Sequence, residues 1–220
     1  MTLTFITGSG TEVGKTFLAC LLIQQLRARG NSVGALKPIV TGFDPGDTTA
    51  SDSGRLLSAL GLPLDQAHID RVSPWRFRAP LSPDMAAARE QRSIPFTELV
   101  DHSHSIATAD VALIEGIGGV LVPLDGEHTV ADWIVALGAS VILVTGSNLG
   151  TISHTLTAME ALVSRGVSIQ HIVVSESIDQ PAPAIETAAV IERFSFGIPI
   201  FVLPRLATAD GAPSLLPLLD

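Results

Sequence analysis

Short apolar runs alternate along this chain with segments that repeat apolar residues at helical spacing. The runs predict β-strands at Leu3–Thr7, Ser32–Lys37, Val111–Glu115, Ser140–Thr145, Ile169–Ser175 and Pro199–Leu203. The helical repeats predict α-helices at Lys15–Arg29, Gly54–Leu60, Pro83–Gln91, Phe96–Ala107, Val130–Leu137, Thr151–Arg165 and Ala182–Phe194.

This alternation predicts an α/β fold with a doubly wound, mainly parallel sheet and helices on both faces. Residues 61–108 are less regular, since prolines interrupt both periodicities there. We find no repeat, low-complexity tract or linker, so we expect one domain over residues 1–220. Ligands of such sheets bind beyond the carboxyl ends of the strands, where the polar motifs of this chain lie.

The composition agrees with strands that are buried on both faces, because 46% of the residues are hydrophobic and only 16% are charged. Glycine or polar residues break every apolar run before the length of a membrane span, and the first residues do not resemble a signal peptide. Cys20 is the only cysteine, so no intramolecular disulfide can form. We therefore expect a cytoplasmic protein that does not enter membranes.

The net charge of −9 argues against a nucleic-acid partner, because the few basic residues are scattered rather than gathered in a patch. The two lysines, Lys15 and Lys37, both lie close to the carboxyl end of a predicted strand. In an acidic chain this placement favours an anionic ligand at that edge of the sheet.

A glycine-rich loop, Gly8-Ser9-Gly10-Thr11-Glu12-Val13-Gly14-Lys15-Thr16, joins the first predicted strand to the first predicted helix. In this context backbone N–H groups converge on phosphate oxygens, and the helix N-terminus adds a partial positive charge. Five residues separate Gly8 from Gly14, whereas the common phosphate loop has four, so this loop is a variant.

We expect Lys15 to reach the β- and γ-phosphates of a nucleotide and Thr16 to ligate Mg²⁺. A glycine-rich turn without a ligand is the alternative, but the strand, the loop, Gly-Lys-Thr and the helix occur together. A dinucleotide fingerprint fits less well, because Lys37 stands where that fingerprint has an acidic residue.

Carboxylates for the magnesium ion are expected at two places. Glu115 ends an apolar strand and precedes a glycine-rich turn, which resembles the acidic strand end of other phosphate-loop enzymes. Asp52 is the second candidate, although Ser51 or Asp52 could instead cap the following helix. Spacing alone does not separate Asp52 from Asp44 and Asp47 in the same polar stretch.

Several motifs, taken together and in order, resemble those of the dethiobiotin synthetase family between about Thr4 and Leu206. They are Gly8–Thr16, Leu36–Gly42, Ser73–Phe77, Ala79–Pro83, Glu115–Gly119, Val122–Leu124, Ala131–Trp133 and Leu149–His154. Each motif alone is weak, but the ordered set is specific. The resemblance implies a fold of the P-loop NTPase type.

Members of that family join CO₂ to 7,8-diaminopelargonic acid and close a cyclic urea at the expense of ATP, in the penultimate step of biotin synthesis. The resemblance implies an ATP-dependent cyclo-ligase with ATP and Mg²⁺ as cofactors. One amine becomes a carbamate, the γ-phosphoryl group moves to it, and the second amine then attacks the mixed anhydride and expels phosphate. Such chemistry requires mainly positioning and charge neutralisation.

Carried over residue by residue, the resemblance implies catalytic roles for Lys37, Lys15 and Thr11. The residues that it implies for the metal are Thr16, Asp52 and Glu115. Those that it implies for the nucleotide are Gly8, Ser9, Gly10, Thr11, Glu12, Val13, Gly14, Lys15, Thr16, Phe17, Ser175 and Pro204. Those that it implies for the substrate diamine, which would bind with CO₂ or bicarbonate, are Thr11, Lys37, Thr41, Gly118, Leu149, Gly150, Thr151 and Ser153.

The family also implies a homodimer in which the substrate carboxylate reaches across the interface. The matching segments are Gly118–Leu121 and Leu149–Ser153, and a helix that starts near Thr151 offers free N–H groups to a carboxylate. This chain departs from the family pattern at three hydroxyl residues. Thr41 stands where serine is common, while Ser153 and Ser175 replace asparagines. Because Ser175 makes fewer fixed hydrogen bonds than asparagine, we expect weaker discrimination of the nucleobase.

Two alternatives keep the fold and change the function. Partition and septum-site ATPases are dimeric switches on DNA or membranes, and they carry an extra lysine early in the loop. Gly8, Ser9 and Gly10 provide none, and we find no basic or amphipathic tail. ATP-dependent amide-forming synthases of the cobalamin type share the fold as well, but they normally carry an additional glutaminase domain.

Overall fold

The computed structural model describes residues 2–206 and 211–219, and a six-stranded parallel sheet forms its centre. The strands follow the order β2-β5-β1-β6-β7-β8, and each hydrogen-bonded pair is parallel. Their bounds are β1 Thr2–Gly8, β2 Val33–Leu36, β5 Val111–Glu115, β6 Ser140–Thr145, β7 Ile169–Ser175 and β8 Ile200–Leu203. The predicted α/β fold with a doubly wound parallel sheet is confirmed.

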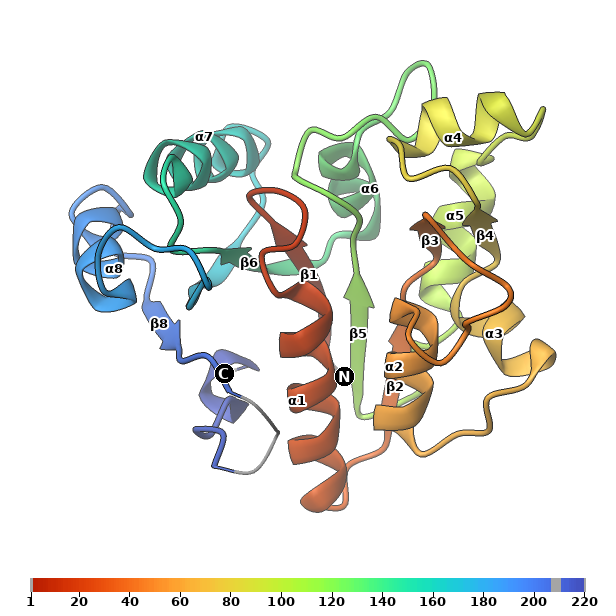
Figure 1. Ribbon diagram of the computed structural model, residues 1–220, viewed down its shortest axis with the longest axis horizontal. Helices are drawn as coiled ribbons and strands as arrows, with labels where there is room; N and C mark the ends of the chain where they lie inside the picture. Colours follow the sequence, from red (N-terminus) through yellow and green to blue (C-terminus); the bar gives the residue numbers. More distant parts are fainter. Residues whose placement is uncertain (1, 207–210, 220) are drawn as a thin grey trace.

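Helices cover both faces of the sheet, and Figure 1 shows α1 lying in front of β1. One face packs against α1 (Lys15–Ala28), α2 (Asp52–Leu60), α3 (Gln66–Val72) and the short 3₁₀ helix η1 (Leu216–Leu219). The other face packs against α4 (Pro83–Arg89), α5 (Phe96–His104), α6 (Val130–Leu137), α7 (Thr151–Val163) and α8 (Ala184–Glu192).

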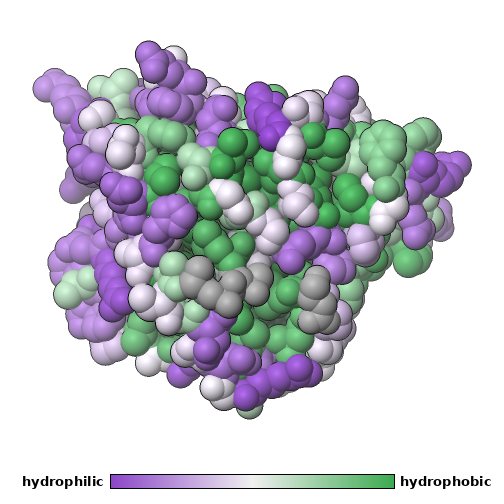
Figure 2. Space-filling model, turned by 180° about the vertical axis from the view of Figure 1, so that it is seen from behind, coloured by the Kyte–Doolittle hydropathy of each residue, from purple (hydrophilic) through white to green (hydrophobic). Residues whose placement is uncertain are grey.

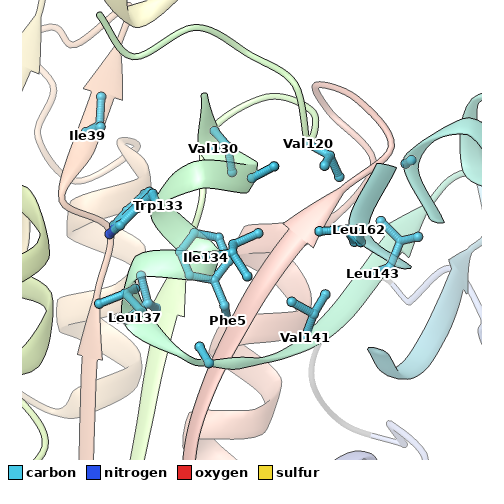
Figure 3. Packing of buried hydrophobic residues seen from close by; sticks show 14 of the residues in the cluster. Phe5, Ile39, Val120, Val130, Trp133, Ile134, Leu137, Val141, Leu143 and Leu162 are labelled. Atoms are coloured by element: carbon cyan, nitrogen blue, oxygen red, sulfur yellow. The ribbon is translucent and has the colours of Figure 1, made fainter. Parts of the chain in front are cut away.

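Successive strand residues enter opposite cores, because side chains alternate along a strand. Phe5 belongs to the core under α6 and α7, whereas Ile6 belongs to the core under α1. Figure 3 shows Phe5 close to Trp133 of α6, and the two rings meet edge to face with their centroids 4.8 Å apart. Burial on both faces explains why the strands read as continuous apolar runs.

The chain also contains elements that the sequence did not predict. Ile39–Thr41 (β3) and Trp75–Phe77 (β4) form a separate two-stranded parallel sheet, and α3 lies between them in sequence. The prediction that the second strand simply stops at Pro38 was therefore incomplete, because a short strand follows the proline. Several predicted helices end a few residues earlier than expected, and α8 also begins two residues later, at Ala184.

Strand β1 lies at the point where the chain changes direction within the sheet. The chain leaves β1 for β2 and β5 on one side, and it later builds β6, β7 and β8 on the other. The carboxyl ends of β5, β1, β6 and β7 carry Glu115, Gly8, Thr145 and Ser175, so these residues share one edge of the sheet. Open α/β sheets bind their ligands at this kind of switch point.

In residues 2–206 and 211–219, no helix has the length and apolar character needed to cross a bilayer.

Candidate functional site

The glycine loop folds into a tight turn between β1 and α1. Gly14 caps α1 with a φ of 97°, a left-handed conformation that glycine adopts without strain. A Cβ atom on Gly14 would also lie 2.7 Å from the Ser175 hydroxyl. Among the described residues no side chain caps α1, and the first turn of the helix has no acidic residue, so its N-terminal N–H groups remain available to an anion.

Lys15 folds back across this turn. Its ammonium group donates to the carbonyl oxygen of Gly10 at 2.7 Å and to that of Gly118 at 2.9 Å. The side chain is buried, and this burial, followed by the charge of Lys37, lowers the pKa of Lys15 to about 8. Lys15 therefore joins the glycine loop to the turn after β5. A bound anion would stabilise the protonated, positively charged form of its side chain.

A cluster of charges lies beside the loop. Lys37 Nζ lies 2.5 Å from Glu115 Oε1 and 2.9 Å from Asp52 Oδ2, and the Thr16 hydroxyl donates to Glu115 Oε1 at 2.6 Å. Burial lowers the pKa of Lys37, but the charges of Glu115 and Asp52 outweigh that effect and raise it. Together with Lys15 the cluster has two positive and two negative side chains, so it can be neutral as a whole.

The same charges act on Asp52 in the opposite direction. Burial alone would raise the pKa of Asp52. The charge of Lys37 and its hydrogen bond outweigh burial and lower the pKa below its ordinary value, so the carboxylate stays ionised. Ser51 caps α2 by accepting a hydrogen bond from Gly54, and Asp52 is thereby placed in the first turn. The capping alternative thus applies to Ser51, while Asp52 remains free to face Lys37.

The cluster offers oxygen ligands of the kind that Mg²⁺ prefers. Glu115 Oε2 is buried and has no hydrogen-bond partner among the described residues, and such an atom calls for a cation or a donor. Asp44 and Asp47, in contrast, accept hydrogen bonds from backbone N–H groups of their own exposed loop. Within residues 2–206 and 211–219, no three His, Cys, Asp or Glu side chains form a complete metal site, so a cation here would also need phosphate or water oxygens.

Two clefts adjoin at the glycine loop. The first has a volume of about 780 Å³ and is lined by the loop from Ser9 to Gly14, by Phe17 and Thr151, and by Ser175 and Pro204. The second has a volume of about 460 Å³ and contains Lys15, Thr16, Lys37, Thr41, Asp52, Glu115 and Gly118. Thr11, Glu12, Gly14 and Phe17 line both. Most of the residues predicted from sequence therefore come together around the loop.

Some predicted residues lie outside these clefts. Gly8 is buried beneath the loop, where a Cβ atom would lie 2.9 Å from Val13 and 3.1 Å from the Lys15 ammonium. Leu149, Gly150 and Ser153 line neither cleft, and the Leu149 side chain is 85% exposed. Of that segment, only Thr151 lines the first cleft.

The clefts also contain residues that the sequence did not single out. Asn148, His154, Glu176 and Arg205 line the first cleft, and Arg55 lines the second. Glu176 directly follows Ser175 and Arg205 directly follows Pro204. Their position next to predicted residues is the one feature of the sequence that could have identified them. The Glu176 carboxylate accepts hydrogen bonds from Gln180 Nε2 at 2.8 Å and from Arg205 N at 2.9 Å, and it thus joins the two loops.

Comparison with solved structures shows the fold. The chain aligns over 94% of its length with 87% of an apo McdA structure from Cyanthece, with a TM-score of 0.54 and 12% identity. It also aligns over its full length with 64% of the signal recognition particle receptor FtsY from Elizabethkingia anophelis, with a TM-score of 0.51 and 13% identity.

Comparison with known sequences shows the family. Residues 3–209 match a family described as an AAA domain. The chain is 46% identical to the ATP-dependent dethiobiotin synthetase BioD of Phenylobacterium zucineum, over 96% of this chain and 92% of that protein. It is 47% identical to the protein of the same name from Caulobacter vibrioides, over 98% of this chain and 97% of that protein. The chain therefore belongs to the ATP-dependent dethiobiotin synthetase family.

Proposed function

We propose that this protein converts 7,8-diaminopelargonic acid, CO₂ and ATP into dethiobiotin, ADP and phosphate in the cytoplasm. The observation that carries the proposal is the cluster of Lys37, Glu115, Asp52 and Thr16 next to the glycine loop, in which Lys37 and Glu115 are buried. Its neighbours are a loop with free N–H groups and a second lysine. This arrangement suits the transfer of a phosphoryl group, which depends on positioning and charge neutralisation.

Each residue has a role in the proposed reaction. The glycine loop and Lys15 hold the nucleotide phosphates. Lys37 neutralises the carbamate that forms from one amine and CO₂, and then the phosphoryl group that moves to it. Thr11 and Thr41 line the same cleft as Lys37 and hydrogen-bond the diamine or its carbamate. The second amine attacks the carbamic–phosphoric anhydride, closes the ring and releases phosphate.

Thr16, Asp52 and Glu115 are the residues that would hold magnesium. They supply two carboxylates and one hydroxyl, and among the described residues no group donates a hydrogen bond to Glu115 Oε2. When bound, the ion would neutralise negative charge on the phosphate groups. The protein's own contribution is to keep these oxygens fixed beside Lys37 and the loop.

We further propose a homodimer that completes the substrate site. Leu149 and Leu121 lie in the two segments expected to meet the substrate carboxylate, and their side chains are 85% and 48% exposed. The rear face of the molecule also carries apolar areas between polar margins, as Figure 2 shows. Coverage of such apolar surface by a second copy would remove it from water.

An assay of turnover tests the proposed function. We expect a product with the mass of dethiobiotin only when diaminopelargonic acid, bicarbonate, Mg²⁺ and a triphosphate are all present. Parallel reactions with ATP, GTP and CTP measure base preference, which Ser175 is expected to weaken. ATP hydrolysis without the diamine, stimulated by DNA or lipid, would instead support a switch ATPase. Ammonia-dependent amide formation on a carboxylic acid would support the amide-forming alternative.

Nucleotide affinity is expected to depend on pH through Lys15. A bound polyphosphate favours the ammonium form, whereas burial lowers the pKa of Lys15 to about 8 in the free protein. Binding therefore takes up a proton above that pH and none well below it. The dissociation constant of MgADP, measured by calorimetry, should rise by up to about tenfold per pH unit above about pH 8. The variant Lys15→Met is the control, and an equal pH dependence in both proteins would exclude Lys15 as the source.

A further inference from the structure

Four hydroxyl groups meet at the carboxyl end of β6. Thr145 Oγ1, which ends that strand, lies 2.8 Å from Ser9 Oγ, 2.7 Å from Thr151 Oγ1 and 2.7 Å from Thr155 Oγ1. Thr145 and Thr155 are fully buried, and Thr151 is 4% exposed. Thr145 is therefore the centre of a buried chain of hydroxyls that joins the glycine loop to the first two turns of α7.

The two ends of this chain are held independently of Thr145. Ser9 N donates to the carbonyl oxygen of Val144 at 2.9 Å. On α7, the Thr151 hydroxyl donates to the Gly146 carbonyl at 3.0 Å, and the Thr155 hydroxyl donates to the Thr151 carbonyl at 2.7 Å. Both buried hydroxyls of α7 thus keep a carbonyl acceptor without Thr145, so removal of the Thr145 hydroxyl leaves neither without a partner.

The protons of these hydroxyls are too few for all the contacts. Four hydroxyl protons serve five contacts, since two of the four groups also face a backbone carbonyl. If Ser9 turns its proton towards an anion in the cleft, only Thr145 can supply the proton between Ser9 and Thr145. Thr145 then has none for Thr151, while Thr155 still donates to Thr145. The contact between Thr145 and Thr151 then keeps a proton only if Thr151 turns its own away from the Gly146 carbonyl, so a change at the loop alters the hydrogen bonds of α7.

We propose that Thr145 is a positioning residue that couples the glycine loop to the N-terminus of α7. Ser9 and Thr151 both line the 780 Å³ cleft, whereas Thr145 does not line it and acts only through them. The inference rests on the proposed function in so far as that cleft takes the nucleotide. Its effect is to fix the distance between the loop that holds the phosphates and the helix that faces them across the cleft.

The test compares Thr145→Val, which removes the hydroxyl at nearly constant shape, with Thr145→Ser, which keeps it. Thr4→Val is the matched control, because Thr4 is also fully buried in the sheet and its hydroxyl has no partner among the described residues. We expect the MgADP dissociation constant to rise by about tenfold in Thr145→Val, because one hydrogen bond that positions the loop is lost. In Thr145→Ser and Thr4→Val it should rise by less than about twofold. Unfolding midpoints in urea show that each variant is folded.

A second variant tests the same chain of hydroxyls from Ser9, its end at the cleft. Ser9→Ala should weaken MgADP binding to a similar degree, and the double variant with Thr145→Val should be no weaker than the weaker single variant, because both remove one link. Unchanged affinity in Thr145→Val, an equal loss in Thr145→Ser, or additive losses in the double variant would each overturn the proposal. The readout is MgADP affinity, so a wild-type protein that binds MgADP but makes no dethiobiotin would refute the proposed function alone.

Discussion

Replacement of Lys37 by methionine is expected to lower kcat by about 10²–10³ while the protein still binds MgADP within a few-fold of wild type. The loss is typical of removing one donor that stabilises charge in the transition state. In the structure Lys37 contacts the two carboxylates rather than the glycine loop, so its proposed partners in the reaction are the carbamate and the moving phosphoryl group. Methionine keeps most of the length of the buried side chain and removes the ammonium group, with its charge and its hydrogen-bond donors.

The matched comparison is Lys15→Met, since this chain has only two lysines. Lys15 hydrogen-bonds the loop itself, and its removal should weaken MgADP binding by at least about tenfold in addition to slowing turnover. Steady-state kinetics and calorimetry on both variants separate the two roles. An unchanged kcat in Lys37→Met, or an equal loss of MgADP affinity in the two variants, would remove Lys37 from the proposed chemistry.

The central sheet could be predicted because its strands carry two signals at once. Each is a run of apolar residues that is buried on both faces, and each is bounded by glycine or polar residues. The small sheet of β3 and β4 gives no such signal. Each strand has three residues, the two pair across more than thirty positions, and a proline precedes β3. Periodicity cannot be read from three residues, so these strands became visible only in the folded chain.

In the site, too, features formed by consecutive residues could be predicted, whereas contacts between distant segments could not. The loop from Gly8 to Thr16 is a continuous motif, so it could be recognised from the sequence, and its residues from Ser9 to Thr16 line the two clefts. Asp44, Asp47 and Asp52 could not be separated by spacing, because the choice depends on the direction that Ser51 gives to α2. The hydroxyl chain through Thr145 depends on contacts between the loop, β6 and α7, and threonines in separate segments carry no such signal in sequence.

Removal of the Glu115 charge is expected to destabilise the fold strongly. Glu115 is buried and contacts Lys37, so Glu115→Gln leaves the Lys37 ammonium with Asp52, whose side chain is 36% exposed, as its remaining ion-pair partner. Breaking a buried ion pair from one side costs about 3–5 kcal/mol, because the remaining charge loses compensation inside the protein. We expect the lower end of that range, since Asp52 and the amide oxygen of glutamine still accept hydrogen bonds from Lys37.

The double variant Glu115→Gln/Lys37→Met separates this charge effect from packing. Because it removes both charges together, its loss of stability should be smaller than the sum of the two single losses by about 2 kcal/mol. Urea unfolding of the three variants and the wild type at pH 7 gives the four free energies of this cycle. Additive losses would mean that the short contact between Lys37 and Glu115 contributes no net coupling.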